Sequence, residues 1–230
     1  SLFGAILHAT KFRPEISAAM GLLGSCLTFP TEELYDCLMH VLVYLGRSRN
    51  VGTTFSAHVP NASKLHAYVD ANWSVTRSTT GFCIMLAGAT ICAVSHRQHC
   101  ITMSSCESEL VALADCAIEL LHVVAVVEFL GHELSGAIEV CTDSKAAYAL
   151  CHRFTSAPNS RHVDRTLFTL RELPGAGRGA VRPTPGQTPP AELYTPIPPR
   201  PLLQPHRQRV PTPPAGPCGG LAAGPTVSAR

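Results

Sequence analysis

Two aspartates, Asp70 and Asp143, each follow a short apolar run and precede small or polar residues. The runs are LHAYV before Asp70 and IEVCT before Asp143, and both have the β-branched and aromatic content of strands. Carboxylates at strand ends gather where a sheet opens to a crevice, so the pair is a candidate for a catalytic or metal-binding site. The alternative is that each aspartate only begins a turn, a common role for this residue.

A third carboxylate, Glu109, lies near the start of a long apolar segment between the two aspartates. Residues on a helix advance by about 100° each, so Glu109 shares a stripe with Leu113 and Leu120, whereas Glu107 points about 160° away. The apolar stripe must face the sheet, which holds Glu109 against it and leaves Glu107 nearer to water. The competing interpretation of Glu109 is a capping-box glutamate in the first helical turn.

Three carboxylates that meet at one point repel one another and resist joint ionisation unless a cation is present. Magnesium suits hard oxygen ligands, and two such ions about 3.5 to 4 Å apart activate a water and stabilise the leaving oxygen in phosphodiester hydrolysis. We therefore expect the side-chain oxygens of Asp70, Glu109 and Asp143 to converge within about 4 to 8 Å.

The elements that must position these residues follow from the hydrophobic pattern. Strands are predicted over 65–70, 81–86, 90–95 and 138–142, with a weak fifth strand over 180–182. Helices are predicted over 105–130, 144–151 and 162–173, the first ending at Gly131. A meander of three strands followed by a helix and a further strand predicts an α/β fold with a mixed sheet flanked by helices.

The two ends of the chain differ from this middle part. Residues 1–60 carry helical spacing broken at Phe29-Pro30, which predicts a helical hairpin whose second helix is capped by Thr31. Fifteen of the 19 prolines follow residue 173, and this density predicts a disordered Pro/Gly-rich tail over 202–230. The expected domains are a helical segment over 1–60, a sheet domain over 61–201 and the tail.

Composition limits the class of protein. With 230 residues, 46% hydrophobic and 15% charged, and a net charge of +2, the chain is neither a miniature scaffold, nor a polyanion-coating protein, nor fully disordered. Its ten cysteines are scattered singly, which favours reduced thiols in a cytosolic setting. Asp115, Glu119, His122 and Glu128 interrupt the longest apolar stretch and argue against a membrane span.

Five ordered blocks of sequence resemble the ribonuclease H domain of copia-type retrotransposon Pol polyproteins. They are YVDANW (68–73), RSTTGF (77–82), SHRQHCITMSSCESELVAL (95–113), VCTDSKAAYAL (140–150) and SRHVDRTLFTLREL (160–173). Upstream, FRPEIS (12–17) and residues 30–52 are similar to the stretch that joins reverse transcriptase to this domain. The catalytic strands of the polymerase are absent, so reverse transcription by this chain alone is not expected.

The resemblance implies a ribonuclease H-like mixed five-stranded sheet and places the family's catalytic residues on this sequence. Its Asp, Glu and Asp fall on Asp70, Glu109 and Asp143, and its fourth carboxylate falls on Glu192, after the small residue Ala191. The family has an aspartate at this last position, so Glu192 is a departure with a side chain one methylene longer. The alternative for Glu192 is a solvated residue in a Pro-rich tail.

The resemblance further implies a metal-dependent endonuclease that hydrolyses the RNA strand of RNA–DNA hybrids. Two Mg²⁺ ions, or Mn²⁺ in their place, are the expected cofactors, with Asp70 as the bridging ligand. The expected partners are the hybrid and the rest of a Pol polyprotein, including reverse transcriptase, with no membrane. The expected location is the cytoplasm, including virus-like particles, or the nucleus.

Two other classes compete with this hypothesis. A catalytically decayed fragment that keeps the fold and binds nucleic acid or a partner is favoured by the altered last block and the modest net charge. A transposase or integrase fits poorly, because those enzymes place their glutamate after the second aspartate, whereas Glu109 precedes Asp143.

Overall fold

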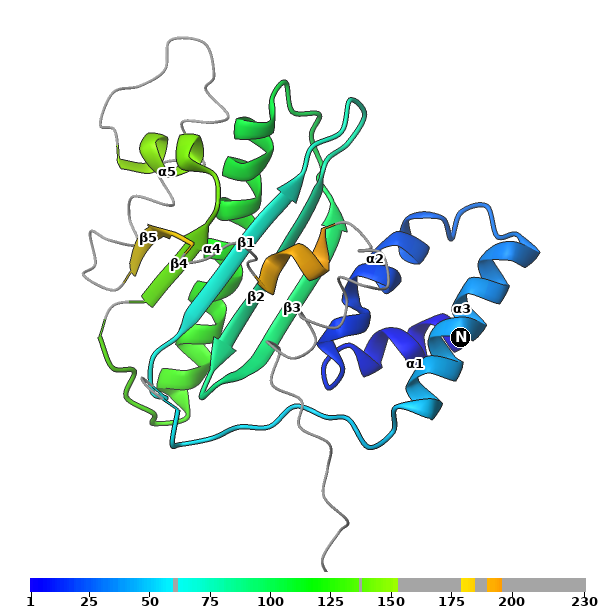
Figure 1. The fold of residues 1–230 in the computed structure, drawn as a ribbon, viewed down its shortest axis with the longest axis horizontal. Helices are drawn as coiled ribbons and strands as arrows, with labels where there is room; N and C mark the ends of the chain where they lie inside the picture. Colours follow the sequence, from blue (N-terminus) through cyan, green and yellow to red (C-terminus); the bar gives the residue numbers. More distant parts are fainter. Residues whose placement is uncertain (60–61, 137, 153–178, 185–189, 196–230) are drawn as a thin grey trace, which may run out of the picture.

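The chain folds into a group of N-terminal helices and a sheet covered by a long helix (Figure 1). This computed structural model describes residues 1–59, 62–136, 138–152, 179–184 and 190–195. The helices are α1 (Leu2–Ala9), α2 (Ser17–Ser25), α3 (Glu32–Arg47), α4 (Ser105–Phe129) and α5 (Lys145–His152), with 3₁₀ turns η1 (Pro14–Ile16) and η2 (Pro190–Tyr194). The strands are β1 (His66–Asn72), β2 (Thr79–Leu86), β3 (Ala89–Arg97), β4 (Ile138–Thr142) and β5 (Gly179–Pro183).

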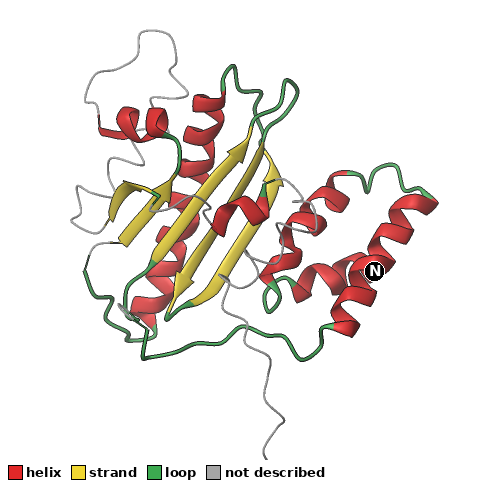
Figure 2. Ribbon diagram, in the orientation of Figure 1, coloured by secondary structure: helices red, strands yellow, loops and turns green. Residues whose placement is uncertain are grey.

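The five strands form one mixed sheet in the order β3-β2-β1-β4-β5 (Figure 2). Strands β1, β2 and β3 pair antiparallel, whereas β4 pairs parallel with both β1 and β5. Ala87 and Gly88, the two residues between β2 and β3, both have positive φ, as a tight type I′ hairpin turn requires. The predicted α/β fold, a mixed five-stranded sheet flanked by helices, is confirmed.

Helix α4 covers one face of the sheet and supplies more of the core residues than any other described element. Leu113, Cys116 and Leu120 are fully buried on its sheet-facing stripe, among Val69, Ile84 and other strand residues. The helix ends at Phe129, and Gly131, just past the C-cap residue Leu130, has a positive φ that allows the chain to turn. By length and composition α4 alone resembles a membrane span within the described residues, but its stripe of contacts with the sheet is that of a core helix.

The N-terminal helices have a small core of their own and dock on the sheet through α2. Ile6, Ile16, Met20 and Leu23 form this core. A Cβ at Gly21 would lie 2.2 Å from the carbonyl oxygen of Ser95 in β3, so the contact between α2 and β3 requires glycine there.

Several predicted elements are confirmed, with shifted ends. The helical hairpin is α2 and α3, and Thr31 caps α3 by accepting a hydrogen bond from the Leu34 amide. Strand β4 has the predicted bounds, whereas β1, β2, β3 and β5 are each longer than predicted. Helix α1 was not predicted. The predicted helix over 162–173 and the tail over 202–230 lie outside the described residues, so the domain boundaries stay predictions.

Candidate active site

Three acidic side chains meet at one edge of the sheet. Asp70 comes from β1, Glu109 from the second turn of α4 and Asp143 from the residue after β4. One carboxylate oxygen from each lies within 4.8 Å of the others. This convergence is the geometry that the spacing of the three residues predicts.

The strand directions explain why the two aspartates meet. In the parallel pair, Val69 of β1 lies opposite Thr142 of β4, so the next residues, Asp70 and Asp143, leave the pair side by side. Both therefore lie at the carboxyl end of a parallel pair, where α/β sheets place their ligands. Asp143 is exposed there, while Asp70 is half-buried.

Glu109 reaches the same edge of the sheet from helix α4, because α4 begins shortly after the chain leaves β3 at that edge. Ser104 caps α4 by accepting a hydrogen bond from the Glu107 amide, and the Glu107 carboxylate accepts one from the Met103 amide at 2.6 Å. Glu107 thus occupies the third helical position, where a capping-box glutamate lies, and accepts from the amide just before the cap, whereas Glu109 lies two residues further along the helix. Glu109 is only 8% exposed and accepts a hydrogen bond through Oε1 from the Ala71 amide at 3.3 Å.

Among the described residues, no lysine, arginine or histidine forms an ion pair with this cluster. Burial, followed by the charges of Asp70 and Asp143, raises the pKa of Glu109 to about 8. Burial also raises the pKa of Asp70, where a hydrogen bond from Thr195 opposes it and the charge of Asp143 adds to it. The Oε2 atom of Glu109 is buried and has no hydrogen-bond partner within the described part of the chain.

These features fit a divalent cation. Carboxylate oxygens are the ligands that Mg²⁺ and Mn²⁺ prefer, and a cation at this point would offset the burial of negative charge and the added repulsion that raise the pKa values of Glu109 and Asp70. It would also give Glu109 Oε2 a partner, which no atom of the described residues provides. Asp70, Glu109 and Asp143 are the residues that would hold it.

A buried polar network supports the start of α4. Gln98, fully buried just after β3, donates hydrogen bonds through Nε2 to Thr80 Oγ1 at 3.1 Å and to the Ser108 carbonyl at 2.8 Å. The Trp73 indole donates to the Thr102 carbonyl at 3.2 Å. These bonds tie the loop between β3 and α4 to the strands, and thereby fix the position of Glu109 relative to Asp70.

Glu192 lies in η2, which crosses the face of the sheet opposite α4 (Figure 1). It is partly buried and is not among the acidic side chains whose oxygens converge within 4.8 Å. Its role as a fourth metal ligand stays a prediction. The same segment contributes Thr195, whose hydroxyl donates a hydrogen bond to Oδ2 of Asp70.

The sequence interpretation missed Thr195 and the support from Gln98. A signal for the first exists, because Gly81 lies within a predicted strand, where glycine often marks the close approach of another backbone. No such signal identifies Gln98, whose partners come from β2 and from the first turn of α4.

Known proteins were compared with the chain. No family model matches it. The Pol polyproteins of the transposons RE1 of Arabidopsis thaliana and TNT 1-94 of Nicotiana tabacum are 28% and 24% identical, over 76% and 87% of this chain. The chain spans only 12% and 15% of their lengths. The secreted RxLR effector protein 161 of Plasmopara viticola is 32% identical over 52% of this chain and 86% of its own length.

Solved structures with limited similarity include LC11-RNase H1, with a TM-score of 0.43, 14% identity and coverage of 54% of this chain and 85% of that chain. The foamy viral protease-reverse transcriptase in complex with an RNA/DNA hybrid gives a TM-score of 0.46 and 16% identity, over 81% of this chain and 24% of that chain.

The relatives in sequence and the ordered sequence blocks agree on one family. The matches to the Pol polyproteins extend over three quarters or more of this chain. Over most of its length the chain is similar to the retrovirus-related Pol polyproteins of transposons, the class that the ordered sequence blocks predict.

Proposed function

We propose that this chain is a ribonuclease H-type endonuclease that hydrolyses the RNA strand of RNA–DNA hybrids with two divalent cations. The observation that carries the proposal is the convergence of Asp70, Glu109 and Asp143 within 4.8 Å at the carboxyl end of the parallel strand pair. Similarity to the Pol polyproteins of transposons supports the choice of a nucleic-acid substrate.

Each carboxylate has a distinct part in the proposed site. Asp70 lies on a strand paired on both sides, so its carboxylate is preorganised to bridge two ions. Glu109 and Asp143 complete the two sets of ligands, and Glu192 is the proposed fourth carboxylate. Two bound ions would supply an activated water and charge stabilisation of the leaving oxygen.

Selection of RNA rests on the shape of the hybrid. The 2′-hydroxyl groups lie across a wide, shallow groove, and contacts to them distinguish RNA from DNA. Because Asp143 is exposed at the sheet edge, a phosphodiester can approach the three carboxylates from solvent. The rest of a Pol polyprotein, including reverse transcriptase, is the proposed partner, and the cytoplasm, including virus-like particles, or the nucleus is the proposed location.

A second candidate function is binding of nucleic acid or of a partner by a chain that keeps the fold but has lost catalytic activity. The observation that favours it is the place of Glu192, a glutamate where the family has aspartate and a side chain outside the convergent group.

Cleavage of a labelled RNA–DNA hybrid by the full chain, with Mg²⁺ and with a chelator, tests the proposal. We expect cleavage only with Mg²⁺ and a loss of at least about 100-fold in Asp70→Asn. Asp36→Asn, which alters an exposed aspartate of α3, is the matched control and should leave cleavage unchanged. Equal cleavage by wild type and Asp70→Asn contradicts the mechanism.

Two substitutions at Glu192 separate the candidate functions. Glu192→Gln should cost less activity than Asp70→Asn, because η2 is a short turn and not a strand of the sheet. Glu192→Asp restores the side chain that the family carries and should hold or raise the rate. No turnover by wild type or by Glu192→Asp, with hybrid binding retained, favours the binding function.

A further inference from the structure

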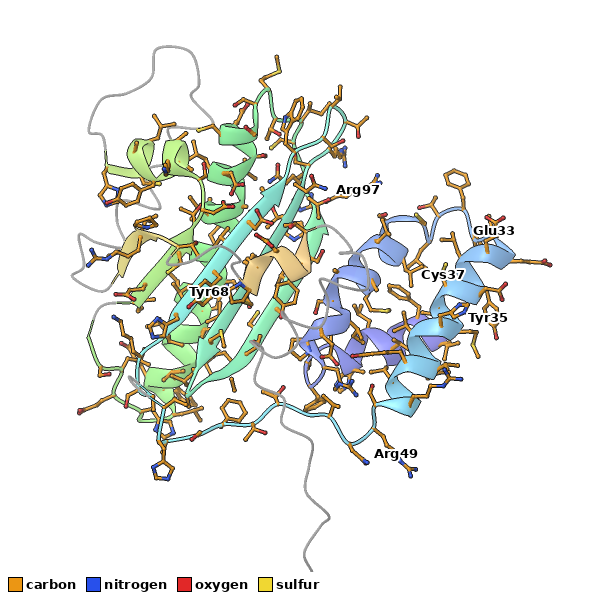
Figure 3. All side chains as sticks on the ribbon, in the orientation of Figure 1. Glu33, Tyr35, Cys37, Arg49, Tyr68 and Arg97 are labelled. Carbon is orange, nitrogen blue, oxygen red and sulfur yellow. The ribbon has the colours of Figure 1, made fainter. Side chains whose placement is uncertain are left out.

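Within the described residues, the short segment η2 and Thr195 cover the face of the sheet opposite α4 beside Asp70. Figure 1 shows η2 lying across β1, β2 and β3 on this face. Tyr194, at the end of η2, is fully buried against Cys83, and Tyr68, Met85 and Ala93 pack around the pair. Figure 3 shows Tyr68 on this face beside η2. Tyr194 therefore anchors the segment on the sheet.

Gly81 makes the close approach of this segment possible. It lies opposite Asp70 in the antiparallel pair of β1 and β2. A Cβ at Gly81 would lie 2.6 Å from Thr195 Cγ2 and 2.7 Å from the carbonyl carbon of Tyr194. A side chain at Gly81 would displace this segment from the strand, so glycine at this position allows Thr195 to reach Asp70.

This packing places Thr195 beside the carboxylate cluster. It is 8% exposed, and its hydroxyl donates a hydrogen bond to Oδ2 of Asp70. That bond restrains rotation of the Asp70 carboxylate. The Asp70 side chain projects from β1 on the face that η2 covers. Glu109, in contrast, approaches from α4 on the other face and is held by the Ala71 amide. Asp70 is thus restrained independently of Glu109.

We propose that Thr195, anchored by Tyr194 and admitted by Gly81, is a positioning residue that fixes the Asp70 carboxylate in the orientation required to bind divalent cations. The proposal rests on the proposed function for the identity of the ligand. Residues that orient a metal ligand from behind typically contribute 10- to 100-fold in metal affinity or activity, roughly the effect expected here.

The test measures Mn²⁺ binding to the full chain by calorimetry, with hybrid cleavage as a second readout. Thr195→Val keeps the shape of the side chain and removes the hydroxyl, and should weaken Mn²⁺ binding by about 10-fold or more. Thr195→Ser keeps the hydroxyl and should bind within about 3-fold of wild type. Thr53→Val removes a hydroxyl that donates to the Phe12 carbonyl, far from the carboxylates in sequence, and should leave Mn²⁺ binding unchanged.

Different results contradict the two proposals. Wild-type affinity for Mn²⁺ in Thr195→Val, or an equal loss in Thr195→Ser, overturns the positioning role. Wild-type chain that binds Mn²⁺ without cleaving the hybrid contradicts the proposed function and leaves the comparison of Thr195 variants intact.

Crystal structures of wild type and Thr195→Val provide a readout that needs neither metal nor turnover. We expect the Asp70 carboxylate to adopt a new orientation, or more than one, when the hydroxyl is removed. One shared orientation in both structures overturns the proposal even if wild type binds no Mn²⁺. Unfolding midpoints within a few degrees of wild type would show that the variants are folded.

Discussion

Glu15, among the N-terminal helices, and Glu109, at the sheet edge, are buried to a similar extent but have opposite surroundings. The Glu15 side chain is 7% exposed and pairs with Arg13 at 2.7 Å, and the Tyr44 hydroxyl donates to it at 3.3 Å. Glu109 is 8% exposed and has Asp70 and Asp143 beside it. The protein itself balances the charge of Glu15, whereas it surrounds Glu109 with like charge.

This difference separates a structural carboxylate from a functional one. Arg13 also donates to the Ser48 carbonyl at 3.1 Å and to the Ser48 hydroxyl at 2.7 Å, so the ion pair joins η1 to the end of α3. Burying carboxylates together without a cation costs stability, and folded proteins accept that cost mainly at sites that bind or react. The uncompensated cluster is therefore the part of the molecule that needs a ligand.

The largest effect is expected from breaking the compensated pair. Arg13→Met keeps the apolar stem and removes the charge, which leaves Glu15 buried without its partner and should lower the free energy of unfolding by about 3 kcal/mol. Urea denaturation measures the loss. Arg49→Met, at an exposed arginine marked in Figure 3, is the control and should change stability by less than about 0.5 kcal/mol. Equal effects of the two substitutions would mean that the ion pair is not structural.

Neutralising Glu109 should stabilise the metal-free protein, which is the opposite of the effect expected for Arg13→Met. Without metal, Glu109→Gln removes the buried like charge and should raise the free energy of unfolding by roughly 1 to 3 kcal/mol at pH 8. It should also abolish cleavage, which makes stability and activity move in opposite directions. Glu133→Gln, at an exposed glutamate, should alter neither. A destabilised Glu109→Gln would show that the protein compensates this charge after all.

The stability of the metal-free protein should also depend on pH through Glu109. Its pKa is about 8 in the folded chain against an ordinary value of 4.5, so the folded state binds more protons between these values. Unfolding free energy should therefore fall as pH rises from about 4.5 to about 8. Unfolding midpoints measured across this range in wild type and Glu109→Gln test the assignment, because the slope should be smaller in the variant.

A further effect on stability should come from the contact that joins the two regions. Gly21→Ala places a methyl group 2.2 Å from the Ser95 carbonyl oxygen and should cost about 1 to 3 kcal/mol by displacing α2 from β3. Gly46→Ala, in a helix position with open space, should instead stabilise by roughly 0.5 to 1 kcal/mol. Hydrogen exchange would locate the change. Loss of protection confined to α1, α2 and α3 would show that the sheet folds independently of the helices.

Local sequence signals predicted most of the fold. The apolar stripe of α4 identified Glu109 as the sheet-facing carboxylate, and the bounds of β4 followed from one β-branched run. Helix α1 was missed because its eight residues, LFGAILHA, have apolar residues on most sides and include a glycine. The place of Thr195 depends on Tyr194 packing against Cys83, a contact between distant segments that periodicity does not encode.

The parallel pairing of β1 with β4 has a consequence for the order of folding. These strands are separated in sequence by β2, β3 and α4, so their pairing closes a long loop and belongs to the slow, non-local part of folding. Asp70 and Asp143 meet only when that step is complete. An ion held by both carboxylates binds the finished sheet and not the open chain, so by mass action it stabilises the folded state in proportion to the logarithm of its free concentration. The free concentration of the divalent cation would then set the stability of the folded sheet as well as its catalytic activity.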